Sequence, residues 1–323
     1  ENHMNFYNPY ESPDIQEERL TTLFNDALSI AYSNGVDLKN YDLVVIFHAG
    51  IGQDFSLPFL DPTPEDLPST FIDQKMIEQY YGSSYLSFGE SQISKGLLLP
   101  ETQNHLLFDI AENMFSDASN PCEYQYGLTG TFSLMIGFAI GLPPLWNIDT
   151  GASGIGVFGL MDQGSNNGRG LIPSPPNAWT RIFAGWESPL VPQYSTTLSL
   201  PSRSENNILK IPINDDEYFL IENRNNKVDN KISLDSIRVL MSVNNEYPPY
   251  IEVLFDSSGC IKDQNGVITS MPNYDVGLPA SGLLIWHIDE AIINTKIDDY
   301  SINNNLDNLG IDLEEADGAQ DIG

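Results

Sequence analysis

The chain has 323 residues, with 14 Lys and Arg against 45 Asp and Glu, which gives a net charge of −31 at pH 7. This charge excludes an autonomous nucleic-acid binder, and it excludes an anionic membrane surface as the main partner, because both need a basic protein surface. Aromatic residues make up 11% of the sequence. Acidic disordered chains are poor in aromatics, so this chain is expected to fold, as one large domain or two.

No apolar stretch approaches the roughly 18 residues that a membrane span needs. The longest, Leu134–Leu145, is interrupted by Gly137, Gly141 and Pro143, so we expect no membrane insertion within this segment. The first residues are polar and show no signal peptide, and the chain stops abruptly after Gly323. We therefore expect a mature or trimmed segment of a longer protein.

The two cysteines, Cys122 and Cys260, allow two interpretations. They are either two buried thiols or one disulfide that closes a long loop, and the disulfide fits an oxidising compartment. The sequence does not decide between them.

The first part of the chain predicts helices around one buried strand. A helix is expected over 14–34, with Asp14 as its N-cap and Gly35 after its end. The apolar, branched run Asp42–His48 predicts a strand buried on both faces. A turn follows, and 55–70 predicts a loop. A second amphipathic helix is expected over 103–116. The apolar face of the first helix is formed by Leu20, Leu23, Phe24, Ala27, Leu28 and Ala31.

A third helix is expected over 123–140, buried because its second half is apolar on nearly every face. A Gly-rich stretch and a short helix around 178–183 follow, and a lobe boundary is expected near 187–194. The sequence thus predicts an α/β lobe with a mixed sheet over 1–190 and a β-rich lobe packed on it over 191–323, with another helix starting near Ala291. The strands expected after the boundary cover 195–200, 208–213, 217–222, 250–255 and 282–288.

The segment Leu134–Pro144 has the frame of a metallopeptidase active-site helix. In such a helix two His four residues apart bind zinc, the Glu after the first His activates water, and a Gly breaks the helix before a third ligand. The glycines and the Leu-Pro of this frame are present, but its zinc ligands and its general base are not. The positions of the two His, the Glu and the third ligand hold, in that order, Leu134, Phe138, Met135 and Pro144.

With this frame, the chain resembles the immune inhibitor A-type secreted metallopeptidases, a metzincin-like family. The resemblance implies a metzincin-like α/β fold with a buried former active-site helix, and it makes Met161 the turn methionine below the metal position. It further implies a secreted or cell-surface location. The segments that carry it, in the family's order, are Tyr41–Gly50, Gly141–Pro143, Gly159–Met161, Ala178–Trp179, Gly185–Trp186, Glu217–Arg224, Gly282–Asp289 and Asp312–Gly318.

The departure from the family concerns activity. Zinc needs three protein donors, which Leu, Phe and Pro side chains do not offer, and Met sulfur is a poor zinc ligand. No shifted His-Glu-x-x-His occurs in the sequence, which has four His in all. The resemblance therefore predicts the fold, no zinc and no peptidase chemistry.

Two interpretations remain for the apolar replacements. Leu134, Met135 and Phe138 either fill the vacated site as core packing, or line an apolar groove that binds a peptide. Met161 is expected to be a packing residue. We expect structural roles for His48 and His287, and Asp289 either pairs with His287 or caps the next helix.

Nucleophilic catalysis has little support in the sequence. There is no Gly-x-Ser-x-Gly elbow. Cys122 lies at the start of the third predicted helix, a position that lowers the pKa of a thiol in general, but no base partner is identifiable. The glycines after residue 151 lack the strand and helix context of a phosphate loop.

The acidic C-terminal stretch gives a candidate structural calcium site. Ca²⁺ binds six to eight oxygens, which Asp, Asn and Glu side chains supply. The spacing is not that of an EF-hand, and a solvated acidic tail is the competing interpretation, although the family resemblance favours calcium. The candidate ligands are Asp289, Asp307, Asp312, Glu314, Glu315 and Asp317.

Two functions follow from these patterns. The first is a non-catalytic peptidase-like module of a secreted or cell-surface protein, which binds an unidentified protein or peptide or acts as a scaffold. The second is an active secreted hydrolase with a rebuilt site. Metal analysis of the purified protein separates the two.

Overall fold

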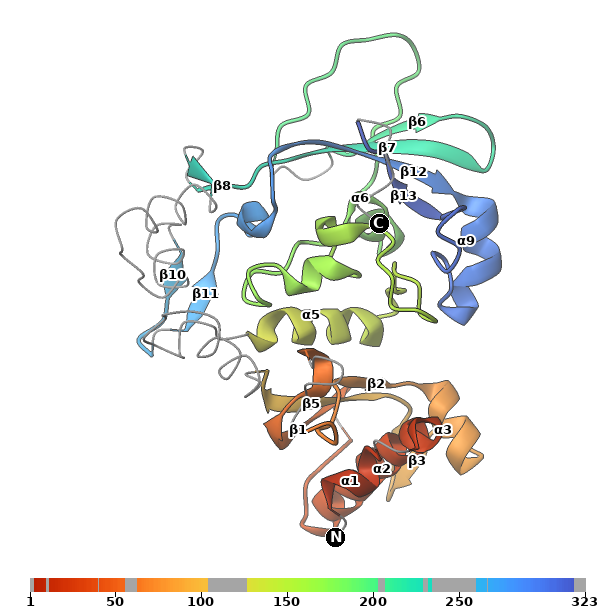
Figure 1. Cartoon of the computed structure of the whole chain (residues 1–323), viewed down its shortest axis with the longest axis vertical. Coiled ribbons are helices and arrows are strands. Elements are labelled where there is room, and N and C mark those ends of the chain that lie inside the picture. The colour runs from red at the N-terminus through yellow and green to blue at the C-terminus, as the bar shows by residue number, and fades with distance from the viewer. Residues whose placement is uncertain are drawn as a thin grey trace. The chain divides into compact units, whose positions relative to one another are not determined.

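The structure is a computed structural model of the chain (Figure 1). It describes residues 3–9, 12–39, 41–55, 63–103, 127–202, 207–228, 232–233, 260–265 and 267–316. The chain forms two compact units, Glu1–Gly141 and Leu142–Gly323. The sequence predicts a boundary near residue 190 instead, which assigns 142–190 to the first lobe. Both units combine helices and strands, so the fold class is α/β.

The first unit is built on a mixed sheet. Strand β5 (Gly96–Thr102) lies in the centre, parallel to β1 (Val44–Ile51) and antiparallel to β2 (Thr70–Ile72). Side chains alternate across β5: Leu98 joins one apolar cluster, whereas Leu97 and Leu99 join another on the opposite face. All three leucines are fully buried. The continuous apolar run of β5 therefore follows from helices covering both faces.

Helix α2 (Gln16–Ser33) covers the face of Leu98 (Figure 1). Its predicted apolar stripe is confirmed at Leu20, Phe24 and Leu28, which are buried. The contact is close, because a Cβ on Gly96 would lie 2.2 Å from Cζ of Phe24. The predicted N-cap is wrong: Asp14 belongs to the 3₁₀ turn Pro13–Ile15, and the N-cap position is occupied by Ile15 without a side-chain hydrogen bond.

Helix α5 (Leu128–Ala139) covers the other face of the sheet. Strand β1 contacts both layers, but Val44, Val45 and Ile46 are only half-buried and Phe47 is 55% exposed. The predicted strand is therefore present, but the prediction that both of its faces are fully buried is wrong. The reason is that β1 is an edge strand of the described sheet, while β5, which we did not predict, is the central strand.

Short elements complete the first unit. Helix α3 follows β2, starts at the N-cap Asp73, whose carboxylate accepts from Met76 N at 2.8 Å, and ends at Gly82 in a left-handed conformation with φ 68°. The helix predicted over 103–116 lies outside the described residues, as does the start of the helix predicted over 123–140. The bounds of the remaining elements are α1 Met4–Tyr7, α3 Gln74–Tyr81, β3 Leu86–Phe88, β4 Ser91–Ile93 and the 3₁₀ turn Gln53–Phe55.

The second unit is built on a four-stranded antiparallel sheet in the order β13-β12-β7-β6. Its strands are β6 (Leu209–Pro212), β7 (Glu217–Arg224), β12 (Gly282–Asp289) and β13 (Ile311–Leu313). Residues of β7 alternate between buried and half-buried, so one face of the sheet is covered more fully than the other.

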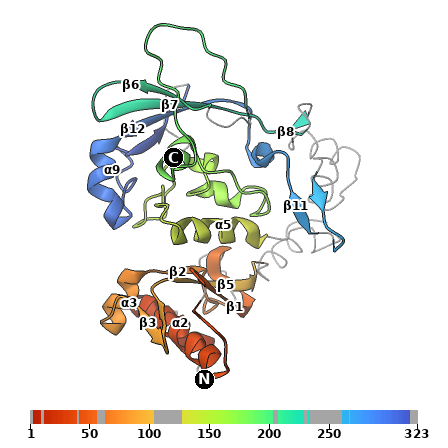
Figure 2. The same cartoon turned by 180° about the vertical axis from the view of Figure 1, so that it is seen from behind.

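Two helices contact the buried face of this sheet (Figure 2). Helix α6 (Ala178–Phe183) brings Ala178 against Glu222 of β7, and α9 (Glu290–Lys296) brings Glu290 against Tyr218. Leu220 and Trp286 are fully buried between them. The helices predicted near 178 and near Ala291 are thus confirmed, as are the strands predicted at 208–213, 217–222 and 282–288.

The strand predicted at 195–200 is wrong. These residues are described, form no strand and are mostly exposed. Alternating Thr and Leu favour a strand only where a neighbouring strand pairs with them. The strand predicted at 250–255 lies outside the described residues.

The other elements of the second unit are short. In the described part of the chain, no helix is long and apolar enough to cross a membrane. The bounds of these elements are β8 Lys227–Val228, β9 Ile232–Ser233, β10 Ile261–Lys262, β11 Ile268–Ser270 and the 3₁₀ turns Gly156–Phe158, Gln163–Asn166, Tyr274–Gly277 and Ile297–Asp299.

Candidate functional site

The residues at the zinc-helix positions lie on α5 and are half-buried. Met135 packs into the apolar cluster of Leu97 and Leu99. The ring of Phe138 stacks on Phe71 of β2, with centroids 6.2 Å apart and an interplanar angle of 18°. Leu134 is half-buried on the same helix. Their side chains thus carry no zinc donor of the usual kind, and two of them join the helix to the sheet.

The other two positions of the frame lie in the second unit. Pro144 is buried, and Met161 is only 1% exposed. The backbone N–H of Leu145 donates to the carbonyl of Met161 at 2.9 Å, which ties the segment after the helix to the turn methionine. Met161 therefore lies in the core, where the sequence places it.

Asp162 was not singled out from the sequence. Its carboxylate fixes the conformation of the Gly-rich loop after residue 151 by accepting hydrogen bonds from it. Its Oδ2 accepts from Ser153 Oγ at 2.8 Å, from Gly154 N at 2.9 Å and from Ile155 N at 2.7 Å. Burial raises the pKa of the Asp162 carboxyl, and these hydrogen bonds oppose the rise. The signal in the sequence was an acidic residue beside a Gly-rich loop. Because its donors come from one local loop, the role is structural.

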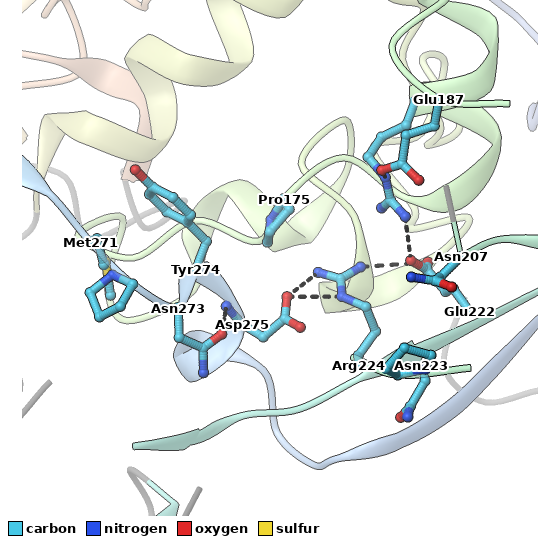
Figure 3. Close-up of a pocket in the computed structure, with 13 residues that line it drawn as sticks. Pro175, Glu187, Asn207, Glu222, Asn223, Arg224, Met271, Asn273, Tyr274 and Asp275 are labelled. Carbon is cyan, nitrogen blue, oxygen red and sulfur yellow. Dashed lines mark hydrogen bonds and ion pairs between the residues drawn. The ribbon is translucent and has the colours of Figure 1, made fainter. Parts of the chain in front are cut away.

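A pocket of about 460 Å³ opens beside α6 and β7 in the second unit (Figure 3). Its floor carries two guanidinium groups and three carboxylates, of Arg181, Arg224, Glu187, Glu222 and Asp275. Its remaining wall combines proline, asparagine and apolar side chains, and Tyr274 is 57% exposed. The other lining residues are Pro175, Pro201, Asn207, Asn223, Met271, Pro272 and Asn273.

Glu222 is the centre of the ionic network. Its Oε2 accepts from Arg181 Nη2 at 2.9 Å, and its Oε1 accepts from Trp286 Nε1 at 2.9 Å and from Ala178 N at 3.2 Å. Arg224 Nη1 lies 3.5 Å from the same Oε1. The carboxylate of Glu222 thus connects β7, β12 and α6 in one buried contact.

The two arginines each have further acceptors. Arg181 Nε donates to Glu187 Oε1 at 2.7 Å, and its Nη1 donates to the carbonyl of Pro176 at 2.6 Å. Arg224 Nε donates to Asp275 Oδ1 at 2.8 Å. Its Nη2 lies 2.7 Å from that same oxygen, at ion-pair distance but without the alignment of a hydrogen bond. Figure 3 shows this chain of contacts from Asp275 through Arg224 to Glu222.

The electrostatics of the pocket keep its central carboxylate ionised. Burial alone raises the pKa of Glu222, but the charges of Arg224 and Arg181 outweigh it, so the pKa lies below its ordinary value. An ionised, fully partnered carboxylate has no proton to donate and little tendency to accept one. The network therefore suits structural stabilisation and the binding of a polar ligand better than acid–base catalysis.

The candidate calcium ligands differ in role and in exposure in the structure. Asp289 caps α9 by accepting from Ile292 N at 3.0 Å, which settles its role between the two alternatives. Asp307 and Glu314 are exposed, and Glu315 is half-buried. Within the described ranges, no group of three or more His, Cys, Asp or Glu side chains is placed to hold a metal ion. Asp317 lies outside them.

Asp312, one of the candidate calcium ligands, lies opposite His287 across β12 and β13. Partial burial, and then the charge of Glu314, raise the pKa of its carboxyl, while His287 acts in the opposite direction. The carboxylate thus loses hydration on folding and is also repelled by Glu314.

The histidines and cysteines give no catalytic arrangement among the described residues. His48 Nδ1 lies 3.0 Å from the carbonyl of Ala49. His287 Nε2 lies 3.2 Å from Glu217 Oε2, so the histidine pairs with Glu217, while Asp289 caps α9. Cys260 is half-buried, and Cys122 lies outside the described residues, so a disulfide between them stays one of two alternatives.

Comparison with protein-family models, with curated proteins and with solved structures gives no match.

Proposed function

We propose that this chain is a non-catalytic, peptidase-like module of a secreted or cell-surface protein, which acts by binding a protein or peptide. The finer fold assignment, a metzincin-like peptidase domain with a degenerate zinc motif, belongs to the same proposal. It is supported by the residues of the zinc-helix frame and by a helix at the position where that frame begins.

One observation carries the proposal: the zinc-helix positions have become packing positions. Met135 lies in the apolar cluster under β5, and Phe138 stacks on Phe71. A zinc ligand and its general base need polar atoms directed at an open coordination position. Here the corresponding side chains are apolar and contact the sheet.

The pocket in the second unit supports binding over catalysis. Its three carboxylates are paired with two arginines at N–O distances of 2.7–3.5 Å. The exposed ring of Tyr274 and the prolines around it offer apolar contact beside polar amides. Pockets of this mixed character fix a ligand by a few polar groups and bury it by apolar ones.

Structural calcium in the acidic C-terminal stretch is a separate part of the proposal. A net charge of −31 opposes the compact state. The pKa of Asp312 is raised first by burial and then by the charge of Glu314, so charge repulsion also acts locally here. A bound cation would reduce the repulsion and stabilise the folded chain by linkage.

An activity assay tests the proposal. The purified chain is incubated with fluorescent casein, an unfolded protein substrate, with added zinc and with a chelator in parallel. We expect no cleavage above that of buffer. The Met135→Ala variant, purified in the same way, reports any contaminating protease. Chelator-sensitive cleavage by the native chain and not by this variant would restore the alternative of a hydrolase with a rebuilt site.

A further inference from the structure

The less buried face of the four-stranded sheet carries a block of apolar side chains. Residues opposite one another in antiparallel strands point to the same face. The register places Leu209, Ile221 and Ile285 in one row across β6, β7 and β12. The next row holds Ile211, Phe219 and His287. Leu283 follows on β12, opposite Asn223. The result is an apolar block, hereafter the outer face, formed by Leu209, Ile211, Phe219, Ile221, Leu283 and Ile285.

The outer face is incompletely covered by the described chain. Leu283 is 60% exposed and Ile285 is 36% exposed, whereas Leu220 and Trp286 on the opposite face are fully buried. Both helices that contact this sheet, α6 and α9, reach it through Glu222 and Tyr218, which belong to the buried face. At one end of the outer face, Asn223 Nδ2 donates to the carbonyl of Leu200 at 2.7 Å.

Acidic residues border the outer face at the end where His287 lies. Glu217 Oε2 lies 3.2 Å from His287 Nε2, and Asp312 lies opposite His287 on β13. The exposed carboxylate of Glu314 follows on the same chain segment, and Asp215 and Asp216 form the exposed turn between β6 and β7. The surface around the apolar block is therefore negative, as is the whole chain.

We propose that the outer face binds a cationic amphipathic helix of a protein partner. This inference rests on the proposed function as a binding module and names the chemistry of the partner. A helix with apolar residues at i, i+3, i+4 and i+7 presents an apolar stripe that fits an open sheet face, and this completes the layer that helices form on the other side. Lysine and arginine beside the stripe match the acidic border.

The charge excludes the other occupants of such a face. A second copy of the chain would bring another net charge of −31 against the same surface. An anionic lipid surface would be repelled for the same reason. A basic helix is attracted, and its apolar stripe removes Leu283 and Ile285 from water. Loss of these two contacts is expected to weaken binding by about tenfold to a hundredfold, because a partner can bury only the exposed parts of Leu283 and Ile285, which are 60% and 36% of each residue.

A binding experiment with charge-neutral variants tests the proposal. The probe is a fluorescein-labelled 18-residue peptide of Leu and Lys at helical spacing, and the readout is fluorescence anisotropy. The site variant carries Leu283→Ser and Ile285→Ser. The control variant carries Ile261→Ser and Val267→Ser, which are 61% and 60% exposed outside the sheet. All three proteins have the same net charge, so non-specific attraction is equal.

We expect the native chain and the control variant to bind the probe equally, and the site variant at least about tenfold more weakly. A peptide with Glu in place of Lys should not bind. Equal affinity for all three proteins would overturn the proposal. So would a native dimer in sedimentation that the site variant dissociates, because the occupant would then be a second copy. Stronger binding to phosphatidylserine vesicles than to the peptide would also overturn it. None of these outcomes alters the separately measured activity, so the two proposals fail independently.

Discussion

The ring of Phe138 stacks on the ring of Phe71, with centroids 6.2 Å apart. Phe138 occupies the position at which the peptidase frame places the second zinc-binding histidine. Its partner Phe71 belongs to β2, so the contact joins α5 to the sheet. The Phe138 side chain thus contributes to packing, whereas a zinc peptidase carries a metal ligand at the corresponding position.

The substitution Phe138→Ala is expected to destabilise the first unit by about 1–3 kcal/mol, less than the roughly 3–5 kcal/mol for a fully buried phenylalanine, because the ring is half-buried. Chemical denaturation monitored by circular dichroism measures this change. Ile140→Ala, at a position just after α5 that is 56% exposed, is the control and should leave the midpoint nearly unchanged. Equal effects of both substitutions would contradict the packing role.

The substitution Glu222→Gln is expected to destabilise the chain by about 3–5 kcal/mol, because it leaves Arg181 and Arg224 without their shared buried carboxylate. Thermal or denaturant unfolding checks this. Glu217→Gln on the same strand is the control, since the Glu217 carboxylate is partly exposed and contacts Asn214 Nδ2 at 3.0 Å and His287 Nε2 at 3.2 Å. A control loss as large as that of Glu222→Gln would argue against the network.

The pH dependence of stability should report the same carboxylate. The pKa of Glu222 is lowered in the folded chain, so its stabilising contribution is present above the unfolded pKa, near 4.5, and is lost as the pH falls through the folded value. The difference in unfolding free energy between the native chain and Glu222→Gln should therefore shrink below pH 4.5. A difference that grows with acidification would show that the sign is wrong.

Calcium is expected to raise the melting temperature, because a bound cation offsets the repulsion by Glu314, which adds to the effect of burial on the pKa of Asp312. Melting curves with calcium and with a chelator check this. The variant Asp312→Asn should reduce the shift, while Asp263→Asn in the β10–β11 turn should not. Identical midpoints in both solutions would favour a solvated acidic tail.

The helices and strands whose apolar residues recur regularly within one segment could be predicted from the sequence. The stripe of Leu20, Phe24 and Leu28 defined α2, and the apolar runs of β7 and β12 defined the second sheet. The central strand β5 was missed because a short run of leucines favours no single element. Segment 195–200 was predicted as a strand because alternation alone does not supply a pairing neighbour.

The candidate site was harder to predict than the fold. The comparison with a zinc-binding helix could be made from the sequence because Leu134, Met135 and Phe138 lie close together in one predicted helix. The pocket was not, because Arg224 and Asp275 are 51 residues apart and meet only through the sheet and the turn after β11. Glu222 appeared in the sequence only as part of a family block, and its burial among arginines is a tertiary property.

The most direct test of the central claim is elemental analysis of the native chain, purified without chelators and dialysed against zinc-containing buffer. We predict zinc far below one atom per chain, because positions 134, 138 and 144 hold Leu, Phe and Pro. One zinc per chain, removed by a chelator together with casein cleavage, would contradict it.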